Sequence, residues 1–150
     1  MTPDDLDLEI LRALQRDASQ SSSQLSRRFD VSQPAIWRRI KRLQDAGIIA
    51  GRRLMLDAEK LGFGVTVFLG VKLATKGRVS LEDFERTVGA IPEVQTVEHV
   101  LGLYDYRLRV VARDLADFER VLRRRIMTLP GVGDVEANVL LSEERLNGPL

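Results

Sequence analysis

The 150-residue sequence contains no cysteine and only one histidine. Without cysteine the chain can form no disulfide framework, no thiolate nucleophile and no zinc–thiolate site, and a single histidine excludes a multi-histidine metal site. The sequence also lacks any apolar run near the roughly 18 residues of a membrane span, and its acidic, amphipathic N-terminus is unlike a secretory signal. We therefore predict no catalytic metal, no cofactor, no membrane partner and a cytoplasmic location.

The chain also has little net charge, only +1, but this charge is unevenly distributed. Eight basic residues and two acids lie between Ser26 and Arg53, whereas the first 25 residues have two arginines and five acids. Such a concentration of positive charge can contact phosphates and release counterions. A basic run on an amphipathic helix is often only a solvated face, so the surrounding motif has to decide between the two interpretations.

The basic region contains the pattern of a helix-turn-helix, SSSQLSRRFDVSQPAIWRRIKRLQDAGII, from Ser21 to Ile49. Ser21 and Gln24 fit a capping box, which predicts a first helix from about Ser22 to Phe29. A second helix is expected after a cap at Ser32, with Pro34 tolerated in its first turn and Gly47 as its stop. The helical spacing predicts one buried face on this second helix, formed by Ile36, Ile40 and Leu43.

The opposite face of the second helix is cationic, and the second helix of such a motif enters the DNA major groove. We therefore predict double-stranded DNA as a partner. The predicted DNA-contacting residues are Ser32, Gln33, Pro34, Trp37, Arg38, Lys41 and Arg42. Arg38, Lys41 and Arg42 are expected to contact phosphates, whereas the residues at the head of the helix would meet base edges. For Ser32 the alternative is a simple cap, and for Trp37 we favour packing at the edge of the core over contact with a thymine methyl group.

Periodicity outside this motif indicates two domains, at residues 1–60 and 61–150. An amphipathic pattern predicts a further helix from Asp4 to about Asp17, which completes a three-helix, winged-helix-like unit. The segment Ile48–Asp57 is expected to form a short strand or wing. The glycines between Asp57 and Gly64 indicate a linker, with the boundary near Lys60.

The second half of the chain alternates strand and helix patterns in the order of a ferredoxin-like βαββαβ sandwich, an α+β fold. A strand from Val65 precedes a helix that is capped by Ser80 and stopped by Pro92. The pattern then predicts a hairpin, a helix and a last strand at residues 94–101, 106–112, 115–129 and 135–141. Phe68 and Gly70 make the first strand apolar on both sides, so we infer that a second copy covers the open sheet face in a homodimer.

These segments together resemble the Lrp/AsnC family of transcription regulators. The resemblance spans nearly the whole chain and rests on LDLEILRALQRDA, LSRRFDVSQPAIWRRIKRLQDAGII, GLYDY and LPGVGDVEANVLLSEE. It implies a DNA-binding domain, a dimerising domain that senses an amino acid or related small molecule, and assembly of dimers into tetramers or octamers. Two departures from the family are Trp37 and the pair Ala137-Asn138, so the identity of the effector does not carry over.

The resemblance also places the effector at the loop from Gly102 to Tyr106. The predicted effector-binding residues are His99, Gly102, Leu103, Tyr104, Asp105 and Tyr106. Glycine would bring backbone N–H groups close to a ligand carboxylate, and Asp105 would pair with an α-ammonium group. Because glycine and aspartate are also favoured in turns, a purely architectural loop is the alternative, and for His99 it is an ordinary polar side chain.

Our leading hypothesis is a ligand-responsive transcription regulator without catalytic activity. One alternative is a catalytic relative similar to the tetrapyrrole decarboxylases that share this layout, although such enzymes have histidines in a central pocket. A sequence-independent nucleoid-associated protein is the second alternative.

Overall fold

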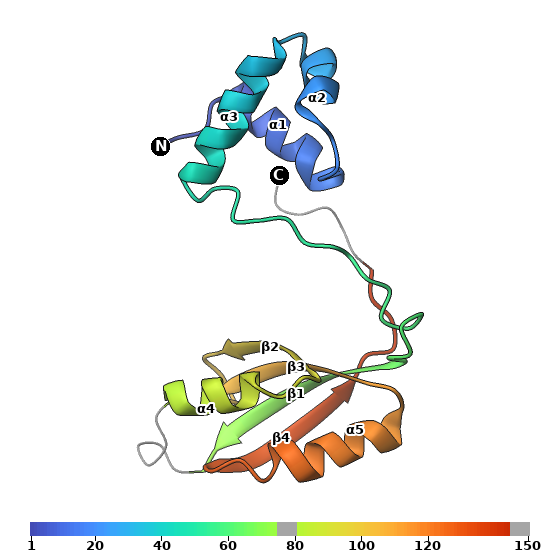
Figure 1. Ribbon diagram of the computed structural model, residues 1–150. Coiled ribbons are helices and arrows are strands. Elements are labelled where there is room, and N and C mark those ends of the chain that lie inside the picture. The colour runs from blue at the N-terminus through green and yellow to red at the C-terminus, as the bar shows by residue number, and fades with distance from the viewer. Residues whose placement is uncertain (75–80, 145–150) are drawn as a thin grey trace. The chain divides into compact units, whose positions relative to one another are not determined.

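The computed structural model describes residues 1–74 and 81–144 and divides the chain into two compact units (Figure 1). Unit 1 extends from Met1 to Met55 and unit 2 from Leu56 to Glu143. The boundary predicted near Lys60 therefore lies a few residues inside unit 2. Among the described residues, none of the helices has the length and apolar character needed to cross a membrane.

Unit 1 consists of three helices, α1 (Asp5–Arg16), α2 (Ser22–Phe29) and α3 (Gln33–Asp45). The predicted helix-turn-helix and the helix before it are thus confirmed. Inward-facing apolar residues recur every three or four positions along these helices. Together they form a common core of Ile10, Ala13, Leu14, Leu25, Ile36 and Ile40. Phe29, predicted to be buried, is only partly buried against this core.

The ends of the helices follow the local sequence. The capping box of α2 is present, because Gln24 N donates to Ser21 Oγ at 3.2 Å and Ser21 N donates to Gln24 Oε1 at 2.8 Å. Asp30 ends α2 in the left-handed region, with φ of +52°, a conformation that aspartate tolerates better than most residues. Ser32 occupies the cap position of α3, but its side chain makes no capping hydrogen bond, unlike the predicted cap.

Of the short strand or wing expected at Ile48–Asp57, the strand is wrong for this structure. Residues 48–57, all of which the structure describes, form no strand. Instead, the backbone N–H groups of Ile48 and Ile49 both donate to the Leu43 carbonyl oxygen, at 3.0 and 3.1 Å, and Ile49 packs against the core. The start of the segment therefore closes the C-terminal end of α3. The backbone N–H groups of Ile48 and Ile49 bond to α3 and not to a neighbouring strand.

Unit 2 contains an antiparallel sheet of four strands in the order β2-β3-β1-β4, which confirms the ferredoxin-like arrangement. Its elements are β1 (Val65–Leu73), α4 (Leu81–Gly89), β2 (Val94–His99), β3 (Tyr106–Ala112), α5 (Leu115–Val121) and β4 (Val132–Val139). Ser80, the predicted cap of α4, lies outside the described residues. The last strand begins at Val132 rather than at Val135.

Helices α4 and α5 cover the same face of the sheet (Figure 1). Alternate residues of β1 point to this face, where they form one core with side chains from both helices. The buried residues of β1 are Val67, Leu69, Val71 and Leu73. Packing of this face fixes the register of β1 and leaves Phe68 and Gly70 on the open face.

The open face is more polar than the sequence of β1 alone predicts. Phe68 is paired with Arg109 on β3 and Asn138 on β4, and Gly70 is paired with Arg107 on β3. The Arg109 guanidinium lies 5.4 Å from the centroid of the Phe68 ring, in a cation–π contact. The expected apolar face is therefore a narrow apolar strip on β1 with charged residues beside it.

The helix predicted at residues 115–129 changes its winding midway. After Val121, α5 continues into a π-helical turn, Leu122–Ile126, in which Met127 N donates to the Leu122 carbonyl oxygen at 2.8 Å. A π turn makes i→i+5 hydrogen bonds and is rare, and such turns often occur at functional sites. Phe118, Val121 and Ile126 are buried, as the helical spacing predicts.

Candidate functional site

A buried aspartate in the first turn of α1 holds α3 in place. Asp7 is fully buried, and its two carboxylate oxygens accept hydrogen bonds from Arg39 Nη1 at 2.9 Å and Arg42 Nη2 at 2.7 Å. Arg39 Nη1 also donates to Asp4, the residue that caps α1, at 2.6 Å. Arg42, predicted as a phosphate contact, is therefore already bound to a carboxylate of its own chain.

Electrostatics reinforces this connection between α1 and α3. The hydrogen bond from Arg39, together with that from the Asp7 backbone, lowers the pKa of the Asp4 carboxyl below its usual value. The hydrogen bonds from Arg39 to the carboxylates of Asp4 and Asp7 raise the pKa of the Arg39 guanidinium. The acids at the start of α1 thus both cap their own helix and neutralise part of the positive charge of α3, which the sequence pattern alone had assigned to DNA.

The remaining exposed face of α3 carries Pro34, Trp37, Arg38 and Lys41. Lys41 forms an exposed ion pair with Asp45 at 2.9 Å, which a competing phosphate can replace at little cost. Arg38 has no hydrogen-bond or ion-pair partner among the residues that the structure describes. Of the three cations predicted to contact phosphate, Arg38 is thus the one most available.

Trp37 does not pack in the way that we favoured. Its side chain is 56% exposed on the same face as Arg38, so the interpretation as a residue of the core edge is wrong. Ser32, Gln33 and Pro34 are also exposed, at the start of α3. The structure therefore presents these four residues, with Arg38, on a surface that a groove of DNA could cover.

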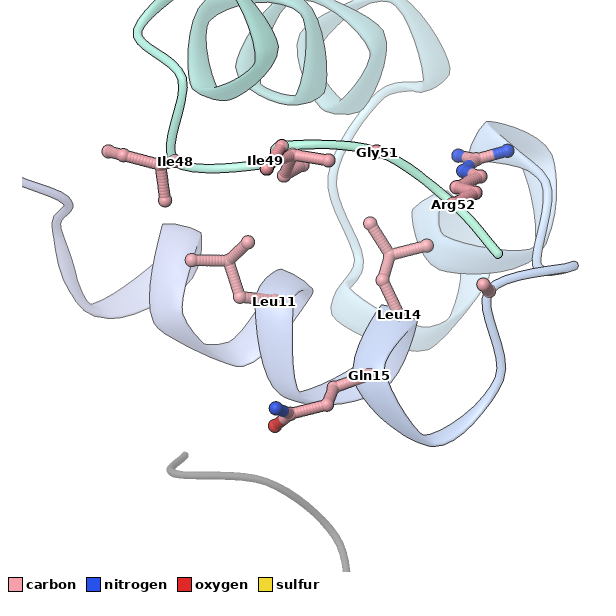
Figure 2. Close-up of a pocket in the computed structure, with 9 residues that line it drawn as sticks. Leu11, Leu14, Gln15, Ile48, Ile49, Gly51 and Arg52 are labelled. Atoms are coloured by element: carbon pink, nitrogen blue, oxygen red, sulfur yellow. The ribbon is translucent and has the colours of Figure 1, made fainter. Parts of the chain in front are cut away.

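A hollow of about 360 Å³ lies in unit 1, between α1 and the segment that follows α3. Figure 2 shows Leu11 and Leu14 pointing from α1 toward this segment, near Ile48 and Ile49. Ile49 packs against the core of unit 1, which holds the start of the segment near α1 without strand pairing. Arg52 lines the same hollow and is exposed.

The predicted effector loop forms part of a second pocket, of about 230 Å³, on the open side of the unit 2 sheet. Of the predicted residues, Gly102, Leu103, Tyr104 and Tyr106 line it. Of the residues that sequence reasoning missed, all but Val100, which follows β2, come from the strands. They are Phe68, Leu69, Gly70, Val100, Arg107 and Asn138. The signal that could have found several of them is the antiparallel register, which aligns Gly70 with Arg107 and Phe68 with Asn138.

The Tyr104 ring lines this pocket and packs against the backbone of Gly70. A Cβ atom at Gly70 would lie 2.6 Å from Cδ2 of the Tyr104 ring, so only glycine allows the ring to rest on β1. The Tyr104 hydroxyl donates a hydrogen bond to the Glu136 carboxylate on β4. This bond raises the pKa of Tyr104 and lowers that of Glu136, so the pair is a phenol and a carboxylate at neutral pH.

Two of the predicted effector residues do not line the pocket. The Asp105 carboxylate accepts a hydrogen bond from Leu73 N at 2.9 Å, and Asp105 N donates to the Val71 carbonyl oxygen at 2.9 Å. These contacts favour the architectural alternative for Asp105, which ties the loop to β1. The His99 ring is exposed and stacks on Tyr106 at 4.9 Å between ring centroids. Tyr106 itself is buried in the core and donates to Glu85 on α4 at 2.7 Å.

Comparison with protein families assigns each unit a role. Residues 3–50 match the model described as winged helix-turn-helix DNA-binding, and residues 66–150 match that of the Lrp/AsnC ligand binding domain. The chain is 37% identical to the proline dehydrogenase transcriptional activator of Rhizobium radiobacter, covering 97% of this chain and 93% of that protein. It is 32% identical to the transcriptional regulator AzlB of Bacillus subtilis, covering 95% and 90%.

Solved structures show the same two-unit fold. A transcriptional regulator from Neisseria meningitidis, crystallised in complex with L-Met, matches with a TM-score of 0.92 and 30% identity over 99% of this chain and 96% of that chain. AsnC from E. coli matches with a TM-score of 0.86 and 26% identity over 99% of each chain.

Proposed function

Because the chain belongs to the Lrp/AsnC family of transcriptional regulators, we propose that it controls transcription by docking the exposed face of α3 in the DNA major groove. The observation that carries this proposal is the pairing pattern of α3. Arg39 and Arg42 are held by Asp7, whereas Arg38, next to the exposed Trp37, is unpaired in the part of the chain that the structure describes. Arg38 and Lys41 contact phosphates, and Gln33 and Trp37 contact base edges.

Salt-dependent DNA binding tests this assignment. Arg38→Ala should weaken binding to all sequences and lower the slope of log affinity against log salt by about one. Arg12→Ala is the matched control, because Arg12 is a half-exposed arginine of unit 1 whose side chain pairs with Glu9 on α1. Gln33→Ala should instead change the preference among upstream fragments. An unchanged salt slope in Arg38→Ala would remove this face of α3 from the interface.

The pocket beside the hairpin loop is the proposed effector site. An amino acid needs a cation for its carboxylate, an acid for its ammonium group and a surface for its side chain. Arg107 supplies the first, Glu136 is held beside the pocket by Tyr104, and Phe68 with Leu103 supplies the apolar surface. The L-Met complex of the Neisseria relative supports an amino acid as the class of ligand.

Calorimetry with a panel of amino acids tests the effector site. Arg107→Gln should weaken binding by about ten- to a hundred-fold, the effect of losing one charge-assisted hydrogen bond. Arg109→Gln is the control, since Arg109 is also on the open face of β3 but does not line the pocket. Equal losses in the two variants would show that the ligand binds elsewhere.

We further propose that the functional form is a homodimer that assembles into tetramers or octamers through unit 2. Support comes from the open sheet face, which none of the described helices covers (Figure 1). Phe68 is partly exposed on this face. A catalytic role is not proposed. The curated relatives are named as transcriptional regulators, and the single histidine, His99, lies on the rim of the sheet against Tyr106 rather than in a pocket.

A further inference from the structure

Besides the proposed effector pocket, unit 2 contains another pocket, of about 250 Å³, that has no role in the functions proposed so far. It is lined by Glu93, Arg113, Asp117, Arg120, Val121, Arg124 and Arg125. Four arginines against two carboxylates leave an excess of two positive charges around one small cavity. Like charges gathered in this way repel one another, so the cluster costs stability unless its own acids or a bound anion offset the repulsion.

The two acids order the arginines without saturating them. Asp117 accepts hydrogen bonds from Arg113 Nε at 3.2 Å and Nη2 at 3.0 Å, and its carboxylate also pairs with Arg120 Nη1 at 3.2 Å. Glu93 accepts a hydrogen bond from Arg125 Nη1 at 3.0 Å. A guanidinium group carries five N–H donors, so each of these side chains keeps donors for a further acceptor while its position is already fixed.

The fourth arginine, Arg124, lies in the π-helical turn with its two neighbours, Arg123 and Arg125. Arg124 and Arg125 line the pocket, whereas Arg123 pairs with Glu119 and does not line it. Arg124 has no side-chain hydrogen bond or ion pair to any residue that the structure describes. A rare change of helix winding thus coincides with an unpaired cation beside three ordered ones.

We propose that this arginine pocket binds a phosphate group carrying about two negative charges. Guanidinium groups match the oxygens of phosphate through paired, parallel hydrogen bonds, and the excess charge of the pocket equals that of such an anion. A zwitterionic amino acid has no net charge to match, and six of the seven residues that line the pocket are charged. A free phosphorylated molecule supplies this charge with one terminal phosphate, whereas the DNA backbone supplies it with two phosphates of one charge each. Both sources present the same phosphate oxygens to the guanidinium groups.

Titration of the full-length protein with sodium pyrophosphate tests the proposal. Isothermal calorimetry should give saturable binding, which Arg124→Gln weakens by about ten- to a hundred-fold. Arg123→Gln is the matched control, because it removes the same charge from the same turn but outside the pocket, and it should bind as the wild type does. Because Arg124 has no partner to lose among the described residues and is repelled by the other arginines, its replacement should not lower the thermal midpoint.

A salt titration of DNA binding with the same two variants identifies the source of the phosphate. If the DNA backbone fills the pocket, Arg124→Gln lowers the salt slope by about one while Arg123→Gln does not. If a free phosphorylated ligand fills it, the slope is unchanged and only pyrophosphate binding is lost. Equal behaviour of the two variants in both assays, or no saturable binding of pyrophosphate together with an unchanged slope, would overturn the proposal. Such a result would leave the proposed role of Arg38 in DNA binding standing, because the Arg38→Ala variant tests that role separately.

Discussion

Replacement of Asp7 by asparagine should destabilise unit 1 far more than any exposed ion pair does. The variant keeps the shape of the side chain but loses the charge that two arginines share, and one carboxylate oxygen becomes an NH2 group facing another donor. Each hydrogen bond to a charged group contributes about 1.5–3 kcal/mol, and an unsatisfied buried group adds a further cost. Asp7 itself is fully buried, so water cannot replace its partners.

The partial exposure of Arg39 and Arg42 reduces the expected loss of stability in Asp7→Asn. The side chains of Arg39 and Arg42 are 27% and 50% exposed, and Arg39 keeps its bond to Asp4, so both cations regain some hydration when Asp7 is neutralised. We therefore expect a loss of about 2–4 kcal/mol in the free energy of unfolding. A core as small as that of unit 1 rarely supplies more than about 3–5 kcal/mol, so much of the unit should be unfolded at 25 °C.

Urea unfolding followed by the fluorescence of Trp37 measures this effect. Trp37 is the only tryptophan in the sequence and lies on α3, so its signal reports unit 1 alone. Asp45→Asn is the control, because Asp45 pairs with Lys41 on the surface of the same helix and should contribute only about 0.3–0.5 kcal/mol. If the urea midpoints of the two variants fall by equal amounts, Asp7 does not stabilise α3 as argued.

Three further predictions concern unit 2. Gly70→Ala should displace the Tyr104 ring and weaken amino-acid binding with a destabilisation of about 1–3 kcal/mol, whereas wild-type affinity would show that the ring is not the pocket wall. Hydrogen bonds from Arg113 lower the pKa of Asp117 from 3.8 to about 2. Their contribution to stability is present above pH 3.8 and is lost as the pH falls through about 2, so the difference in thermal midpoint between the wild type and Asp117→Asn should shrink over that range; a constant difference would refute the coupling. Phe68→Glu should dissociate the homodimer that we propose, as measured by sedimentation, and an unchanged mass would place the dimer contact elsewhere.

The features that the sequence predicts well are those set by neighbouring residues. Periodic apolar positions located all three helices of unit 1, and the spacing of Ser21 and Gln24 placed the start of α2 at Ser22. In unit 2, the apolar pattern that begins at Val65 located β1. Each of these signals depends on interactions within a few residues, which the order of amino acids determines directly.

The features that escaped prediction depend on partners distant in the chain. The charge on α3 is visible in the sequence, but the capture of Arg42 by Asp7, 35 residues away, is not. The sequence suggests a ligand for Asp105, because its hydrogen bond from the Leu73 backbone forms only in the folded chain and leaves no local pattern. The π turn after Val121 has the same apolar spacing as an α-helix, and hence no pattern in the sequence distinguishes the two.

The two units use the same local device to separate structural from functional arginines. Each has an aspartate pair spaced three apart at a helix start, Asp4 with Asp7 in α1 and Asp114 with Asp117 in α5, where the first residue caps the helix. Asp7 and Asp117 are the buried charged residues in the described parts of the chain, and each holds two arginines. Near each group lies an arginine whose side chain has no hydrogen-bond or ion-pair partner within residues 1–74 and 81–144, Arg38 in unit 1 and Arg124 in unit 2. Because an unpaired surface cation contributes little to folding, its strongest available interaction is with an anion from outside the chain, and its removal should reduce binding without unfolding the unit that carries it.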